Sequence, residues 1–225
     1  MSAGFLVPLA LTLKVASLAT GSALVLGLLA AYLLTRWDFP GWDWLDALLT
    51  LPLVMPPTVL GYYLLVFIGR NGFLGRWLLE HFGISLMFTW QAAVLAATVV
   101  SFPLVFKSAR AALETVGKNY ENAARTLGQG EWAVFLRVSL PLAFRGILAG
   151  AMLAFARAMG EFGATLMVAG NLPGRTQTLS LAVYSAVQAG DRQLANSLVL
   201  VVSVVCALIL VLASKLVKPK SQPSV

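Results

Sequence analysis

The sequence predicts an all-α integral membrane protein with about five transmembrane helices. Of its 225 residues, 59% are hydrophobic and only 11% are charged, and the mean hydropathy is +0.85. A soluble domain of this length could not hide so much apolar surface, whereas a bilayer can. The apolar runs are continuous and about 20 residues long, without the alternation of barrel strands, which indicates helices. We therefore expect a single membrane domain over residues 1–225.

Five apolar stretches are long enough to cross a bilayer, namely 5–34, 45–68, 90–113, 141–168 and 194–216. An odd number of spans would place the two termini on opposite sides of the membrane. The longest interval without such a run is 118–141, between the third and fourth stretches. A polar segment this long in an apolar chain indicates a surface for a soluble partner.

The distribution of basic residues predicts the orientation, because Lys and Arg accumulate on the cytoplasmic side. Arg157 lies inside a span, and five basic residues fall on one side: Lys14, Arg70, Arg76, Arg175 and Arg192. The other ten are Arg36, Lys107, Arg110, Lys118, Arg125, Arg137, Arg145, Lys215, Lys218 and Lys220. We therefore expect the N-terminus outside, and the 118–141 segment and the C-terminus in the cytoplasm.

Small residues recur every four positions in the first and fourth spans. They are Ala19, Ala23, Gly27 and Ala31, and then Gly146, Gly150, Ala154 and Ala158. On a helix this spacing makes a smooth stripe that another helix can approach closely, in a bundle or a dimer.

Two shorter segments do not qualify as spans. Residues 73–82 are amphipathic and end at Gly83, which predicts an interfacial helix on the outer surface with Trp77 and Trp90 at headgroup level. Residues 179–189 are too few to cross a bilayer, so we expect a re-entrant or interfacial segment there.

The 118–141 segment begins with an amphipathic pattern. Apolar residues recur at helical spacing on one face, at Val116, Tyr120, Ala123, Ala124 and Leu127. The small side chains of the paired alanines let another protein surface approach this face closely. The next glycines, at 128 and 130, should end this helix. A further helical turn carries the apolar residues at 132, 135 and 136. Pro141 should then begin the next span, where its missing N–H costs nothing.

The spacing within this segment resembles a known family. The segment resembles the cytoplasmic loop signature of permease subunits of binding-protein-dependent ABC importers. The residues that match it are Ala123-Ala124, Gly128, Val138 and Leu140-Pro141. The family often has Glu directly before the paired alanines, whereas this chain has Asn there and Glu one position earlier. The residues that the resemblance implies for contact with an ATPase are Glu121, Asn122, Ala123, Ala124, Gly128, Leu140 and Pro141. It leaves open which of the first two makes the contact.

A charged pair lies within the fourth span. Arg157 and Glu161 are four residues apart and can pair on one helix face, which offsets the cost of charge at membrane depth. The pair either holds the bundle together or, through Arg157, lines or gates an anion path. Gly160 and Gly163 allow a bend beside it. The run from Gly160 to Thr165, Gly-Glu-Phe-Gly-Ala-Thr, is similar to molybdate permeases and, less closely, to sulfate permeases.

Prolines interrupt the second span. Pro52, Pro56 and Pro57 prevent a regular helix, and irregular backbone at membrane depth is stable only where it is buried or lines a cavity. Either Pro56, Pro57 and Thr58 border a pathway, or the prolines form a simple kink. The stretch from Leu51 to Gly75 again resembles molybdate permeases. The similarity covers nearly the whole chain, which implies a domain core at about 11–216.

Several functions are excluded or disfavoured by what the sequence lacks. It has no Gly-x-x-x-x-Gly-Lys-Ser/Thr phosphate loop, so the chain cannot hydrolyse ATP, and it offers no catalytic residues. No pair of carboxylates in different spans supports ion coupling. Cys206 and His81 are the only residues of their kinds, so we expect no metal site. No basic run is interleaved with aromatics, which argues against nucleic-acid binding.

The resemblance implies a type I ABC importer permease fold, with 118–141 as its cytoplasmic coupling segment. Two copies of the chain would form the pathway, each docked on one ABC ATPase subunit that uses the ATP, so no cofactor is expected on this chain. A periplasmic or lipid-anchored binding protein would deliver molybdate to the outer face, and the spans would carry it across the cytoplasmic (inner) membrane by alternating access. Sulfate, thiosulfate or tungstate remain alternatives, and so does a stand-alone channel or ion-coupled carrier.

Overall fold

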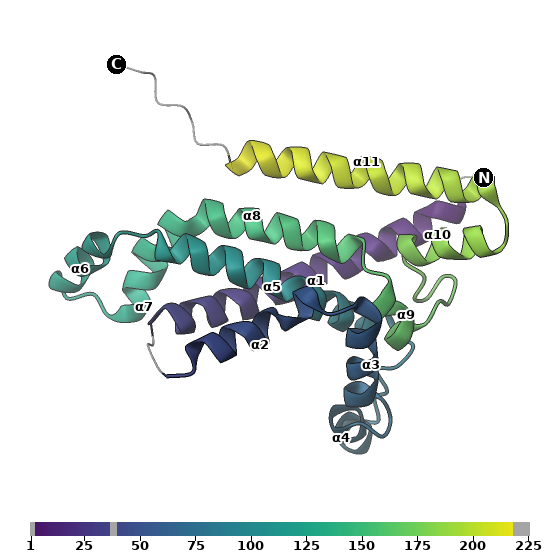
Figure 1. Ribbon diagram of the computed structural model, residues 1–225, viewed down its shortest axis with the longest axis horizontal. Coiled ribbons are helices and arrows are strands. Elements are labelled where there is room, and N and C mark those ends of the chain that lie inside the picture. Colours follow the sequence, from purple (N-terminus) through teal and green to yellow (C-terminus); the bar gives the residue numbers. More distant parts are fainter. Residues whose placement is uncertain (1–2, 37–39, 218–225) are drawn as a thin grey trace.

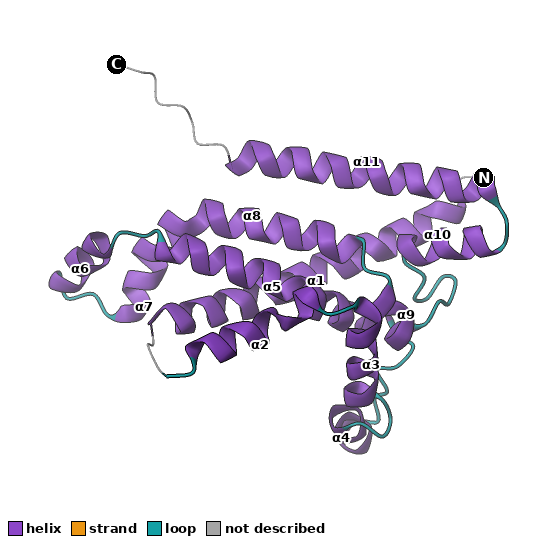
Figure 2. Cartoon of the chain, in the orientation of Figure 1, coloured by secondary structure: helices purple, strands orange, loops and turns teal. Residues whose placement is uncertain are grey.

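The computed structural model describes residues 3–36 and 40–217, and within these ranges all regular structure is helical (Figure 2). The elements are α1 (Ala3–Arg36), α2 (Trp42–Val54), α3 (Pro57–Ile68), α4 (Phe73–Phe82), α5 (Trp90–Glu114), α6 (Lys118–Thr126), α7 (Glu131–Val134), the π-helical segment η1 (Phe135–Ser139), α8 (Leu140–Met159), α9 (Gly163–Ala169), α10 (Leu179–Gln188) and α11 (Arg192–Val217).

The long helices form an elongated bundle. In Figure 1, α1, α5, α8 and α11 run along the long axis, with α6 and α7 at one end and α10 at the other. Helix α5 packs against both α1 and α8, and many of its alanines are fully buried between them. The prediction of an all-helical membrane domain is confirmed, because four described helices are long and apolar enough to cross a bilayer, and α2 with α3 would make a fifth span.

Both small-residue stripes face α5. A Cβ added at Gly27 would lie 3.1 Å from Val105 Cγ1, and one at Gly150 would lie 2.4 Å from Ser108 Cβ. The backbones of α1 and α8 therefore approach α5 more closely than side chains at these positions would allow. The stripes are seams within one chain, and their other members are fully or largely buried: Ala19, Ala23, Ala31, Gly146, Ala154 and Ala158.

The interruption predicted in the second span is confirmed. Helix α2 makes an angle of 111° with the stretch 57–82, which contains α3 and α4, and the break lies at Met55 and Pro56. Both residues have extended backbone, with ψ of 142° and 134°. A residue before proline is pushed out of the helical region, and Pro56 and Pro57 occur in succession. Pro52, in contrast, is accommodated inside α2.

The fourth span differs from its prediction. It ends at Met159, and Gly160 to Phe162 separate it from the short helix α9. At its other end Pro141 lies in the first turn of α8, as expected. The helical turn predicted before it is not separate from α8 but continuous with it. The chain runs through η1 without a break, and the Leu140 N–H donates to the Phe135 carbonyl five residues back. The wider π turn fits a proline that has no N–H to donate to the carbonyl four residues before it.

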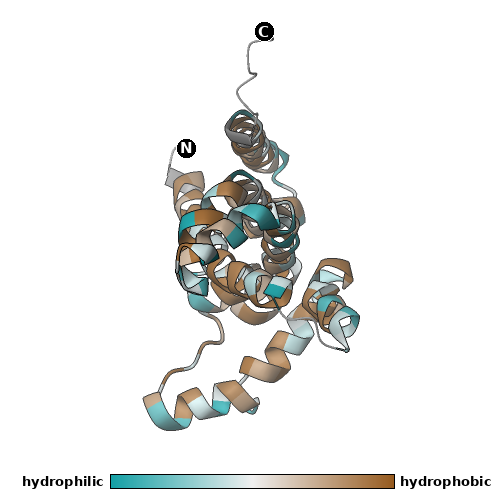
Figure 3. Ribbon diagram, turned by 90° about the vertical axis from the view of Figure 1, so that its left-hand side faces the viewer, coloured by the Kyte–Doolittle hydropathy of each residue, from teal (hydrophilic) through white to brown (hydrophobic). Residues whose placement is uncertain are grey.

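The two shorter segments are confirmed as separate helices. Helix α4 is amphipathic and ends at Gly83, whose φ of 65° is left-handed. In Figure 3, which looks along the bundle from the α6 end, α3 and α4 stand away from the other helices as an arm. Helix α10 has 10 residues and packs against α1 and α11. The positions of Trp77 and Trp90 relative to a headgroup layer stay predictions.

The ends of the bundle agree with the grouping of basic residues in the sequence. Arg36 and Lys215, in the last turns of α1 and α11, lie at the same end as α6 (Figure 1). The start of α1 lies at the opposite end. Lys218 and Lys220 lie outside the described residues.

Candidate functional site

Helix α6 opens the 118–141 segment, and none of its residues is buried. It ends where Gly128 takes a φ of +78°, and the N–H of the next residue, Gln129, donates back to the Ala124 carbonyl at 3.2 Å. A Cβ at Gly128 would meet no atom within 4 Å, so glycine is needed here for its backbone conformation and not for space.

The predicted face of α6 is largely confirmed. Tyr120 and Leu127 are 64% and 81% exposed, and Ala123 between them is exposed too. Val116 does not belong to this face, because it precedes α6 and packs on the cluster around Phe106. Tyr120, Ala123 and Leu127 therefore form an exposed apolar surface at the tip of the bundle.

Four charged side chains of alternating sign close a ring behind α6. Arg125 on α6 pairs with Glu121 (Nη2 to Oε2, 3.2 Å) and with Glu131 on α7 (Nε to Oε1, 2.7 Å). Arg36 at the end of α1 pairs with Glu121 (Nη2 to Oε1, 3.5 Å) and also with Glu131. Ser139 of η1 donates from Oγ to Glu121 Oε1 at 2.6 Å. We call these five residues the charge ring.

The charge ring distinguishes Glu121 from its neighbour. The Glu121 side chain is only 18% exposed and faces inward, whereas Asn122 is exposed and its Oδ1 accepts a hydrogen bond from Arg125 Nη1 at 2.7 Å. The hydrogen bond that Arg125 donates to Glu131 is the main cause that raises the pKa of Arg125 above its ordinary value. Of the two neighbours, Asn122 is therefore the residue presented outward.

An aromatic cluster adjoins the charge ring. The Tyr32 ring lies 5.2 Å from that of Trp132 and 4.3 Å from that of Phe135, and the Arg36 guanidinium lies 5.4 Å from the Tyr32 ring. Trp132 is still 61% exposed, because a pocket of about 430 Å³ opens between it and Leu33. The last turn of α1 is thus attached to the loop by both charge and aromatic contacts.

The remaining two predicted coupling residues lie at the start of α8. Leu140 packs in the same apolar cluster as Tyr32 and Phe135, and Pro141 is exposed. Neither side chain belongs to the outward face of α6.

The charged pair in the fourth span lies where α8 ends. Arg157 Nη1 is 2.9 Å from Glu161 Oε2, and the Glu161 side chain is 2% exposed. Its other oxygen, Oε1, accepts a hydrogen bond from the backbone N–H of Ala164 at 2.9 Å, at the start of α9. The ion-pair interpretation is thus confirmed in geometry, and Glu161 also fixes the break between the two helices. A gating role of Arg157, which is 32% exposed, stays a prediction.

The two candidate pathway regions meet although they are about a hundred positions apart in sequence. A Cβ at Gly163 would lie 2.9 Å from Pro57 Cβ and 3.4 Å from the Thr58 nitrogen. One at Gly61 would lie 2.8 Å from Met167 Cβ. Helix α9 therefore lies directly on α3, while Pro56, Pro57 and Thr58 keep exposed surface.

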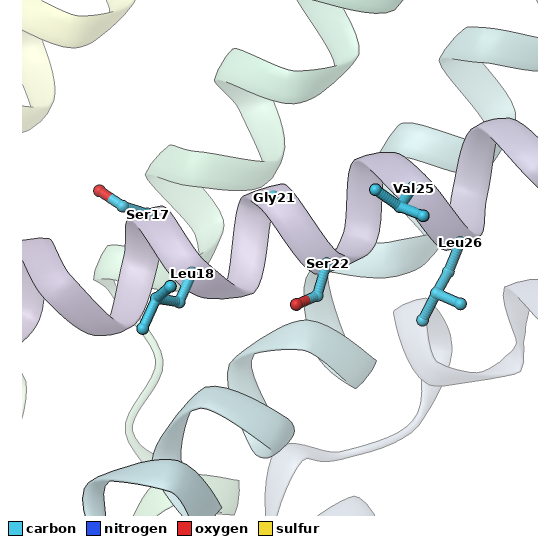
Figure 4. Close-up of a pocket in the computed structure, with 6 residues that line it drawn as sticks. All are labelled: Ser17, Leu18, Gly21, Ser22, Val25 and Leu26. Carbon is cyan, nitrogen blue, oxygen red and sulfur yellow. The ribbon is translucent and has the colours of Figure 1, made fainter.

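A hollow on the exposed face of α1 was not predicted. Its volume is about 540 Å³, and it carries two hydroxyl groups, Ser17 and Ser22, beside Gly21 (Figure 4). No atom lies within 4 Å of a Cβ built at Gly21. The other lining residues are Leu18, Val25 and Leu26.

Comparison with known proteins identifies the family. Residues 23–219 match the family described as "Binding-protein-dependent transport system inner membrane component". The chain belongs to this family. The resemblance seen in the loop signature is thereby confirmed, as is an integral inner-membrane location.

Relatives within the family differ in their stated cargo. The chain is 48% identical over 205 residues to the molybdenum transport system permease protein ModB of Escherichia coli K12, covering 91% of this chain and 90% of that protein. It is 42% identical to ModB of Haemophilus influenzae, covering 94% and 93%. It is 39% identical to the sulfate transport system permease protein CysT of Escherichia coli K12, covering 83% of this chain and 67% of that protein.

Solved structures confirm the type I importer permease fold. A chain of the MetNI methionine ABC transporter in inward facing conformations superposes with a TM-score of 0.74 at 18% identity, covering 96% of this chain and 98% of that one. A chain of a bacterial ABC transporter that imports alginate gives a TM-score of 0.71 at 15% identity, covering 99% and 82%. At these identities the likeness concerns the fold alone.

Sequence reasoning missed the residues that lie behind α6. Arg36, Tyr32 and Ser139 were not singled out, although Tyr32 and Arg36 are four apart at the end of a span and so share a helix face. Arg36 was counted only as an orientation marker. A cation and an aromatic one turn apart at a span end would have been a usable signal for a contact with the neighbouring polar loop.

Proposed function

We propose that this chain is the membrane-spanning subunit of an ATP-driven ABC importer that carries molybdate across the cytoplasmic membrane by alternating access. The observation that carries the proposal is the 48% identity over nearly the whole chain to a molybdenum transport permease. The exposed face of α6 supports the proposal, because the small side chain of Ala123 lets a partner ATPase approach the helix closely.

The assembly we propose is a homodimer of this chain, with one ABC ATPase subunit docked on the α6 face of each copy. A periplasmic or lipid-anchored binding protein would deliver the oxyanion at the opposite end. The chain itself would be non-catalytic and bind no cofactor, and the ATPase partner would use the ATP. The ends of the bundle support this arrangement: α6 lies with the ends of α1 and α11, whose last turns are basic, which fits a cytoplasmic location. The N-terminus would then be outside.

Among the predicted coupling residues we assign the ATPase contact to Asn122, Ala123 and the turn at Gly128. Asn122 is favoured over Glu121 because the carboxylate of Glu121 is already engaged by Arg36, Arg125 and Ser139. Leu140 and Pro141 would act from behind, by fixing where α8 begins.

For the pathway we propose the junction of α3 and α9. Pro56, Pro57 and Thr58 form its exposed edge, Gly163 permits the close approach, and the ion pair of Arg157 with Glu161 holds α9 in place. Because Arg157 pairs with Glu161, the carboxylate of Glu161 is not left unpaired to repel a divalent oxyanion at this junction.

A sulfate importer is the second candidate, favoured by the 39% identity to CysT. The two functions are separated by transport in proteoliposomes containing the permease, its ATPase and its binding protein. Molybdate uptake should require ATP and the binding protein, and excess sulfate should not compete. A matched preparation whose ATPase lacks its phosphate-loop lysine should show no uptake. Uptake by the permease alone without ATP would instead establish a stand-alone carrier, and inhibition by sulfate would favour the second candidate.

A further inference from the structure

We propose that Arg36 is a positioning residue for coupling, which makes α1 part of the path by which movement of α6 reaches the membrane spans. The proposal rests on the proposed function, since it concerns how an importer of this kind transmits the action of its ATPase. It also gives Glu121 an internal role in the charge ring in place of an ATPase contact.

The first support is the topology of the charge ring. Its members come from four elements that are separated in sequence: Arg36 from α1, Glu121 and Arg125 from α6, Glu131 from α7, and Ser139 from η1. Each glutamate is bridged by both arginines, so no single contact carries the connection. A closed ring of alternating charges resists displacement of any one member more than an isolated surface pair does.

The second support is burial. The side chains of Arg36 and Glu121 are 21% and 18% exposed. Arg36 Nη2 is buried, and among the residues that the structure describes its only partner is Glu121, through the ion pair. Because water screens these groups only partly, their separation is more costly than that of exposed ions. Tyr32 adds apolar contact one helical turn away, through Trp132 and Phe135.

The third support is what lies behind Arg36. Helix α1 is joined to α5 along the stripe of small residues that includes Gly27, and α5 is joined in the same manner to α8. A helix packed this closely moves as a body with its neighbour. A displacement of α6 is therefore delivered through Arg36 to α1, in addition to the direct covalent route through η1 to α8.

The experiment uses the complete reconstituted complex and measures two rates, ATP hydrolysis and molybdate uptake. In Arg36→Gln the ring loses two of its ion pairs, and we expect uptake per ATP hydrolysed to fall on the order of 5-fold while hydrolysis stays within about 2-fold of wild type. Arg36→Lys should recover only part of the ratio, because an ammonium group cannot bridge two carboxylates as a guanidinium does.

Two further variants separate coupling from simple loss of structure. Arg76→Gln removes another ion-paired arginine, on α4 and away from the ring, and should leave the ratio unchanged. The double variant Arg36→Gln/Glu131→Gln should lower the ratio no further than the single variants, since all act on one ring. Size-exclusion chromatography must show that each complex stays assembled.

Each outcome decides one question. An unchanged ratio in Arg36→Gln, or effects that multiply in the double variant, would overturn the role of Arg36. If hydrolysis and uptake fall equally and the complex disassembles, the charge ring only stabilises the structure. That outcome would also overturn the role of Arg36 in coupling. If wild-type vesicles take up no molybdate under ATP, the proposed function fails instead, and the two failures are distinguishable.

Discussion

The contact between α9 and α3 gives the sharpest prediction about the candidate pathway. In Gly163→Ala the new Cβ would lie 2.9 Å from Pro57 Cβ, and 3.4 Å from two backbone atoms, the carbonyl carbon of Pro57 and the nitrogen of Thr58. Carbon atoms prefer separations of roughly 3.5–4.0 Å, so α9 and α3 must separate by on the order of 0.6–1 Å. The proline ring cannot rotate away, and such overpacking typically costs about 1–3 kcal/mol.

A matched control lies three residues earlier. A Cβ at Gly160 would find its nearest atoms, the Ala156 and Arg157 carbonyl oxygens, at 3.8 Å, which is ordinary contact. The backbone there, with φ of −86°, also accepts alanine. Gly160→Ala should therefore match wild type in thermal unfolding and in molybdate uptake, while Gly163→Ala should unfold at lower temperature and take up less molybdate. Identical behaviour of the two variants would refute the reasoning, because it would mean that the α3–α9 approach is not tight.

Three other changes test separate parts of the site. Gly128→Trp should abolish uptake while leaving membrane insertion and dimerisation intact, because the position has φ of +78° and open space in front of it; surviving uptake would reduce the segment to a plain loop. Replacing Thr58 with Trp should lower uptake at normal expression if this edge borders the pathway, and unchanged uptake would show that the prolines form only a kink. Arg157→Leu should destabilise the protein by about 3 kcal/mol, because it leaves the buried Glu161 carboxylate unpaired. The double variant Arg157→Leu/Glu161→Leu should destabilise it less. Thermal unfolding of the two variants, compared directly, checks which is less stable.

The parts of the fold that the sequence predicted are those set by local chemistry. Apolar runs determine the spans, Gly83 and Gly128 end their helices at left-handed φ, and Pro56-Pro57 breaks the second span. Each of these effects depends on residues within one or two turns. The end of the fourth span was missed because hydropathy stays high past Gly160, and the break there depends on Glu161 capping α9, a specific side-chain contact.

The parts that could not be predicted depend on contacts between distant residues. Arg36 and Glu131 are separated by 95 positions, and nothing in either neighbourhood specifies the other as its partner. The inward turn of Glu121 depends on Ser139 and Arg36 being present behind α6, so the choice between Glu121 and Asn122 could not be made from spacing alone. Gly163 and Pro57 were each singled out for a different local reason, and only the structure brings them together.

The helix from Glu131 to Met159 connects the two candidate sites physically. It has 29 residues and at 1.5 Å per residue spans about 43 Å, with the charge ring at one end and the Arg157–Glu161 pair at the other. Its π turn lies beside Ser139, so the ring contacts the helix where its hydrogen bonds are already out of the regular α pattern. Its far end stops two residues before Glu161, the glutamate that caps α9. We therefore expect a small rotation of the loop during transport to be transmitted along this continuous helix to α9, the element that packs on α3 at the proposed pathway.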